Sequence, residues 1–327
     1  MYNPADWPLV IHRVVAPAGY VAADADNDYY LLRDDLLPFS FGGNKVRIAY
    51  EFVRHMYEQG KNALVMYGDR CSNLCRVLAY LCHGEQISCV MVASHESGDE
   101  GQSFNARLVD TLGVEVITCD SSSVALAVDE AMSLLESRGY QPYYIYGDRL
   151  GRGNEGTAGL AYARTYAQLC AWEHAHDLHF DLVVTPYGTG ATLGGLITGS
   201  LKANDGREVR GISISSRPRE RALSILEATV QQTAGRSETV LPDNWKDALR
   251  LETAYNLGGY GKSNDRVHDF IDQMLCDNSV PMDPTYTGKA FLGMLDYIKE
   301  HEVNHKRVLF IHTGGTPLFY DYLNMKA

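Results

Sequence analysis

The alternation of short apolar runs with helical patterns constrains this 327-residue chain more than any other feature. Strands are predicted at residues 63–67, 88–93, 114–119, 142–146, 181–185, 209–213 and 308–312. Helices are predicted at residues 47–59, 72–84, 104–112, 124–137, 157–174, 193–201, 220–234, 265–276 and 287–300, with a short terminal helix. The segment 235–262 is polar and shows neither the helical nor the strand periodicity of apolar residues. Strands separated by such helices predict an α/β fold with parallel sheets covered on both faces.

Composition and charge narrow the class of protein. The length suits one large or two modest domains. A formal net charge of −12 argues against nucleic-acid and anionic-membrane partners. No apolar run reaches membrane-spanning length, and the first residues form no signal peptide. The seven cysteines are an odd number without zinc-ligand spacing, which favours a reduced, cytoplasmic protein.

One lysine stands where a glycine loop meets a predicted helix. The stretch Gly42-Gly43-Asn44-Lys45 precedes the helical pattern 47–59. Backbone N–H groups, the positive end of the helix dipole and burial all lower the pKa of an amine at such a place. A neutral amine can form a Schiff base with a carbonyl group. Lys45 is therefore a candidate for covalent chemistry, although a solvated surface lysine is the ordinary alternative.

Four further loops fall at the carboxyl ends of strands, where ligands bind in such sheets. Residues 187–192 (YGTGAT) would cradle a phosphate, but they lack the lysine of a nucleotide P-loop and the third glycine of the dinucleotide fingerprint. Residues 71–74 (CSNL) suit a carboxylate. Residues 283–289 (DPTYTGK) and 312–317 (HTGGTP) complete the set. Each could be a plain turn or helix cap, but four of them together with the lysine indicate one active site.

Together these five motifs resemble the tryptophan-synthase-β-like, fold type II, pyridoxal-phosphate enzymes. Within them, the chain resembles the branch of 1-aminocyclopropane-1-carboxylate deaminase and D-cysteine desulfhydrase. The resemblance extends from residues 33–35 (RDD) to the HTGGTP loop. It implies that Lys45 holds pyridoxal 5'-phosphate covalently. It also implies a phosphate site at Gly188, Thr189, Gly190, Ala191 and Thr192, ring contacts from Asn73, Thr287 and Thr313, a carboxylate contact from Ser72, and two active-site tyrosines, Tyr260 and Tyr286.

The sequence departs from the resembled pattern at several positions. The asparagine loop of the family usually reads Gln-Ser-Asn-His or Gln-Ser-Asn-Gln, whereas this chain has Cys71-Ser72-Asn73-Leu74. Glycine and an apolar residue usually precede that loop, whereas this chain has Asp69-Arg70. Ala191 replaces a typical glycine. Arg70 is interpreted as a surface side chain; the second hypothesis is that it selects substrates with another negative charge.

The resemblance and the residues predict an α,β-elimination that deaminates a small amino acid and yields a 2-oxo acid and ammonia. Lys45 would act as the general base, and Tyr260 or Tyr286 would donate a proton or position the substrate. Cyclopropane deaminases carry a glutamate where this chain has Thr287. A hydroxyl supports a protonated pyridine ring less than a carboxylate does, so we expect little cyclopropane opening.

Other functions remain as alternatives, among them a 1-aminocyclopropane-1-carboxylate deaminase of the same branch, and no metal site is expected. A second nucleophile could convert elimination into β-replacement. A non-catalytic relative could keep the fold as a binding module, which the altered asparagine loop would favour. A metal enzyme could use the histidines around residues 174–179, although these residues are interpreted as a solvated helix end.

The predicted architecture has two α/β domains with the cofactor between them. A small domain of residues 49–158 is inserted into a large domain of residues 1–48 plus 159–327. The resemblance implies a homodimer.

Overall fold

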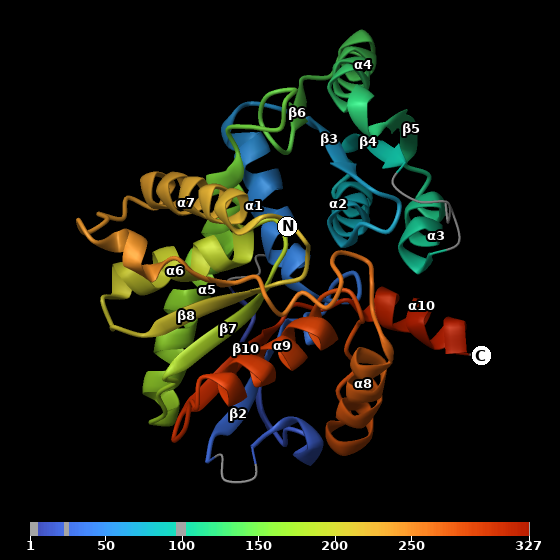
Figure 1. Ribbon diagram of the computed structural model, residues 1–327. Helices are drawn as coiled ribbons and strands as arrows, with labels where there is room; N and C mark the ends of the chain where they lie inside the picture. The colour runs from blue at the N-terminus through green and yellow to red at the C-terminus, as the bar shows by residue number, and fades with distance from the viewer. Residues whose placement is uncertain (1–5, 23–25, 96–102, 327) are drawn as a thin grey trace.

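Two separate β-sheets organise the protein (Figure 1). The computed structural model describes residues 6–22, 26–95 and 103–326. The larger sheet has six strands in the order β1-β2-β10-β7-β8-β9, and the smaller has four in the order β5-β4-β3-β6. All pairings are parallel except that of β1 with β2. The strands are β1 Ile11–Val14, β2 Asp28–Arg33, β3 Ala63–Gly68, β4 Ser88–His95, β5 Glu115–Asp120, β6 Pro142–Tyr144, β7 Leu182–Tyr187, β8 Glu208–Ser213, β9 Arg250–Glu252 and β10 Arg307–His312.

The large sheet is covered on both faces. Alternate residues of its central strands enter two different apolar clusters: Leu309 of β10 packs in one and Phe310 in the other. Helices α5, α6 and α7 pack against one another and α6 contacts β7 and β8; α9 also contacts these strands, with α8 beside it. The helices are α1 Asn44–Glu58, α2 Asn73–Gly84, α3 Phe104–Thr111, α4 Val124–Ser137, α5 Glu155–His176, α6 Ala191–Ala203, α7 Arg219–Arg236, α8 Asp265–Asn278, α9 Thr287–Glu300 and α10 Thr316–Lys326.

The small sheet lies at the top of the molecule as drawn in Figure 1, with α2, α3 and α4 around it. Helices α2 and α4 contact its strands, and α3 packs on α2 and on the C-terminal α10. Among the described residues, none of the helices combines the length and apolarity needed to cross a bilayer.

The α/β class with mainly parallel sheets is confirmed. Every strand predicted from the sequence is present, although β6 ends at Tyr144 rather than 146, because the chain turns at Gly147 with φ +96°. The sequence patterns missed β1, β2 and β9. The small sheet is built only from residues within 63–144, which agrees with a small domain of residues 49–158; that boundary stays a proposal.

Candidate active site

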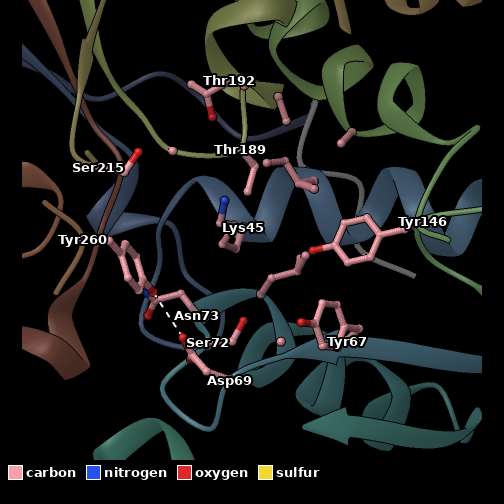
Figure 2. A pocket seen from close by; sticks show the side chains of 18 of the residues that line it. Lys45, Tyr67, Asp69, Ser72, Asn73, Tyr146, Thr189, Thr192, Ser215 and Tyr260 are labelled. Carbon is pink, nitrogen blue, oxygen red and sulfur yellow. Dashed lines mark hydrogen bonds between the residues drawn. The ribbon is translucent and has the colours of Figure 1, made fainter. Parts of the chain in front are cut away.

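A cavity of about 1000 Å³ lies where loops from both sheets face each other. Its lining contains the predicted lysine, the phosphate-loop residues, the asparagine loop and both tyrosines. These residues are Lys45, Ser72, Asn73, Gly188, Thr189, Gly190, Ala191, Thr192, Tyr260, Tyr286 and Thr313. Figure 2 shows Lys45 near the centre, with Thr189 and Thr192 on one side and Ser72 and Asn73 on the other.

Lys45 is held in place by the backbone of its own loop. The turn before it requires glycine, because Gly43 has φ +100° and a Cβ there would lie 2.9 Å from the Thr313 carbonyl oxygen. Gly43 N–H donates to the Asp34 carbonyl at 2.7 Å, and Asn44 N–H donates to the Thr313 carbonyl at 3.0 Å. The guanidinium of Arg47 pairs with the buried Asp34 carboxylate at 2.9 Å. The start of α1, and with it Lys45, is thereby fixed beside the HTGGTP loop.

The amine of Lys45 is poised to react as a nucleophile. Burial lowers its pKa from 10.5 to about 8, because the charged form loses hydration. Burial also lowers the pKa of Lys289 to about 8. The Lys289 amine, however, donates to the Gly259 carbonyl oxygen, and Lys289 does not line the cavity. Only Lys45 of these two lysines faces the space where a ligand would bind.

The phosphate loop ends at an uncapped helix. Gly190, with φ +97°, is the N-cap of α6 and has no side chain to accept from the first amide groups. Those N–H groups and the helix dipole favour an anion at this end of the cavity. The Thr192 hydroxyl accepts a hydrogen bond from Asn44 Nδ2 at 2.9 Å, which links this loop to the residue before Lys45.

The asparagine loop presents a second helix N-terminus. Ser72 Oγ accepts from the Cys75 N–H at 3.3 Å and so caps α2, which leaves its own proton free to donate. Asn73 Oδ1 accepts from Asn105 Nδ2 at 3.1 Å, which leaves the Asn73 amide N–H groups as donors. Asn105, fully buried on α3, also donates to the Cys71 carbonyl at 2.6 Å and so fixes the loop.

The two tyrosines are linked to each other. Their hydroxyl oxygens are 3.1 Å apart, and the Tyr260 hydroxyl donates to Asp69 Oδ2 at 3.3 Å. Desolvation by burial is the main cause that raises the pKa of both phenols, so both are protonated at neutral pH. Protonated phenols can donate a hydrogen bond and position a substrate, but they carry no charge.

One predicted cofactor-binding residue, Thr287, does not lie in the cavity. Thr287 is fully buried and absent from the lining: its hydroxyl donates to Asp283 Oδ2 at 2.8 Å and accepts from the Asp283 N–H at 2.9 Å. It stabilises the start of α9 instead of contacting a ligand. Arg70 pairs with Asp110 of α3 at 2.6 Å, outside the lining, which agrees with a surface role.

Sequence reasoning also missed several lining residues. Tyr67 and Tyr146 come from the end of β3 and the turn after β6, Ser215 follows β8, and Asp69 precedes the asparagine loop (Figure 2). Their positions at strand ends were the available signal.

The residues present fit pyridoxal 5'-phosphate. The Lys45 amine, with its lowered pKa, would hold the aldehyde of the cofactor, the uncapped α6 N-terminus would hold its phosphate, and the Asn73 amide would meet its ring oxygen. The cavity volume accommodates the cofactor together with a small amino acid.

Comparisons with known proteins point to the same chemistry. Residues 15–314 match the family model described as pyridoxal-phosphate dependent enzyme. A D-cysteine desulfhydrase of Yersinia pestis (strain Pestoides F) is 28% identical over 301 residues, which covers 90% of this chain and 88% of that protein. A Pyrococcus abyssi (strain GE5 / Orsay) protein provisionally named 1-aminocyclopropane-1-carboxylate deaminase is 31% identical over 301 residues, which cover 90% of this chain and 86% of that protein. The crystal structure of a homologue of 1-aminocyclopropane-1-carboxylate deaminase superposes with a TM-score of 0.82 at 25% identity. The match covers 98% of this chain and 93% of that one.

Proposed function

Because the chain belongs to the pyridoxal-phosphate-dependent enzyme family, we propose that it is a lyase acting on a small amino acid with a leaving group on Cβ. D-Cysteine is the leading substrate. The overall reaction is D-cysteine plus water giving pyruvate, ammonia and hydrogen sulfide. The likeness to a D-cysteine desulfhydrase over 90% of the chain supports this choice.

The chain's own residues account for binding and proton transfer. When bound, the cofactor supplies an electron sink for the charge that develops at Cα. The α2 N-terminus, with the Ser72 hydroxyl, binds the substrate carboxylate, and Asn73 holds the ring oxygen. The Lys45 amine takes the proton from Cα as the Cβ–S bond breaks. Tyr260 and Tyr286 line the cavity as neutral phenols that orient the leaving group.

The arrangement of two helix N-termini about Lys45 is the observation on which this function rests. One, at Gly190, suits the phosphate, and the other, at Ser72, suits a carboxylate. The bound cofactor would bring one of these anions, its phosphate, and an amino-acid substrate would bring the other, its carboxylate. The amine that must react lies between them (Figure 2).

A substrate panel tests the function. The holoenzyme is incubated with D- and L-cysteine, β-chloroalanine and 1-aminocyclopropane-1-carboxylate while 2-oxo acid and sulfide are measured. We expect 2-oxo acid from D-cysteine and β-chloroalanine and little from the cyclopropane, with Lys45→Ala as the inactive control. Efficient cyclopropane opening would make the deaminase the function. A cofactor-loaded protein inert toward the whole panel would favour a binding module instead.

β-Replacement is tested in the same assay by adding a second thiol. Consumption of D-cysteine without a matching yield of pyruvate, together with a new thioether amino acid, would show that the added nucleophile is captured.

We also propose that the enzyme is a cytoplasmic homodimer. Seven cysteines without a disulfide suit a reducing compartment. Leu36 and Phe41, on the loop before Lys45, are 48% and 47% exposed and offer apolar surface to a second copy. Light scattering at the mass of one chain would contradict the dimer, and cell fractionation tests the compartment.

A further inference from the structure

Asp69 is the only carboxylate among the described residues that line the cavity. It follows β3 directly, at a tight turn: the Ser72 N–H donates to its carbonyl at 3.1 Å, and a Cβ on Gly68 would lie 2.9 Å from Ser72 Oγ. The turn that places the asparagine loop therefore also places Asp69 at the cavity wall. The mechanism proposed above gives this carboxylate no task.

The Asp69 carboxylate ends a chain of hydroxyl groups. The Tyr260 hydroxyl has a single proton, which it donates to Asp69 Oδ2 at 3.3 Å. Tyr260 therefore cannot donate to Tyr286, so the 3.1 Å contact between the two hydroxyls has Tyr286 as the donor. The direction of donation runs from Tyr286 through Tyr260 to Asp69. The protons of both phenols are directed along the cavity wall, and Asp69 sets that direction.

This hydrogen bond joins the two halves of the active site. Asp69 lies in the turn after β3 of the small sheet, whereas Tyr260 lies on the loop between β9 and α8. The buried Lys289 anchors that loop through the carbonyl of the neighbouring Gly259. The Tyr260 residue is 43% exposed, and its ring makes an edge contact with the ring of Tyr286 at a centroid distance of 5.9 Å, so the Asp69 contact adds to this packing in holding the hydroxyl. The dashed line in Figure 2 marks the Asp69 contact, which lies on the same side of the cavity as Ser72 and Asn73.

We propose that Asp69 is a positioning residue that fixes Tyr260 over the substrate side of the cavity by accepting its hydroxyl proton. The inference rests on the proposed function, because Tyr260 is taken to contact the substrate. Asp69 acts through the tyrosine. An acceptor oxygen is required at this position, so asparagine should substitute for aspartate and alanine should not.

Kinetics of the holoenzyme test the coupling. With D-cysteine, Asp69→Ala should lower kcat/KM about tenfold, as expected for loss of one orienting hydrogen bond. Asp69→Asn should stay within about threefold of wild type. In the Tyr260→Phe background, Asp69→Ala should cause no further loss, because the interaction is already gone. Arg70→Ala, in the same loop but paired with Asp110 outside the cavity, is the matched control and should match wild type.

Two kinetic results would overturn the proposal: an Asp69→Ala enzyme as active as wild type, or an equal loss from Asp69→Ala with and without the Tyr260 hydroxyl. Crystal structures of the Asp69→Ala and Asp69→Asn holoenzymes give a readout that needs no turnover. The Tyr260 and Tyr286 hydroxyls should separate beyond hydrogen-bond distance in the alanine variant only; an unmoved Tyr260 would also overturn it. If the panel shows no elimination, the function fails, and the crystal structures still decide the role of Asp69.

Discussion

Gly314 packs directly on Gly43: a Cβ built on Gly314 would lie 2.5 Å from the Gly43 Cα atom. Both residues have positive φ, +95° and +100°. The last glycine loop of the chain therefore touches the loop that carries Lys45, and neither position tolerates a side chain. The reactive amine owes its place to contact between two backbones.

Gly314→Ala should destabilise the protein and weaken cofactor retention, because the methyl group must push the Lys45 loop away. We expect a loss of about 1–3 kcal/mol in the free energy of unfolding, measured by urea denaturation. Gly139→Ala is the matched control, since Gly139 has φ +84° but open space around its Cβ position. Equal losses in both variants would mean that backbone strain, and not the contact, sets the cost.

The rate at which the apo-protein takes up the cofactor should depend on pH in the same way as the neutral fraction of the Lys45 amine. Its pKa of about 8 means that the neutral, nucleophilic fraction falls about tenfold per pH unit below 8 and levels off above it. The rate of loading, measured by absorbance, should have the same profile, and Lys45→Ala should show no lysine-linked cofactor. A rate still rising tenfold per unit through pH 9 would contradict the lowered pKa. Borohydride reduction should attach the cofactor to the Lys45 peptide and not to that of Lys289.

Ser72→Ala should impair turnover more than cofactor binding. The hydroxyl caps α2, so its loss costs about 1 kcal/mol of stability, and it should also lower kcat/KM about tenfold or more through the lost carboxylate contact. Ser103→Ala removes the equivalent cap from α3, where Ser103 Oγ accepts from the Ala106 N–H at 3.1 Å outside the cavity. Similar turnover in the two variants would leave Ser72 with a capping role alone.

Gly190→Val should raise the dissociation constant of the cofactor about tenfold or more, because a β-branched residue is strained at φ +97° and its side chain would press on Thr229, Tyr187 and Ile225, which should displace the amide groups at the start of α6. Equilibrium dialysis measures the change. Gly206→Val reproduces a positive φ, +69°, at a surface turn with open space and controls for strain. Cofactor affinity unchanged in Gly190→Val would place the phosphate elsewhere.

Most of the site could be predicted from the sequence, because strand ends collect ligand-binding loops and the loop residues have distinctive chemistry. Thr287 was misplaced because position alone does not give side-chain direction: as the first residue of α9, it turns back to Asp283 four residues earlier. Asn105 could not be predicted, since its role exists only where α3 meets the asparagine loop. The same holds for Asp69, whose partner lies 191 residues away.

For the fold, too, some elements could be predicted from the sequence and others could not. The long, strongly periodic helices and most of the buried parallel strands were recognised to within a few residues, but β2 was not. The strands that were missed include β1 and β9, which have four and three residues and lie at the edges of the large sheet. Short edge strands have too few residues to establish a pattern, and their pairing is decided by the sheet they join.

The position of β10 between β2 and β7 has a consequence for synthesis. The strand that precedes the Lys45 loop finds its parallel neighbour only when residues 307–312 have left the ribosome. Until then, the Lys45 loop also lacks the Thr313 carbonyl that accepts from Asn44. The small sheet, whose strands all lie within residues 63–144, can form during translation. Capture of the cofactor must wait until residues 307–313 have emerged, so a nascent chain that is shorter, or a chain truncated before them, has no assembled site to receive it.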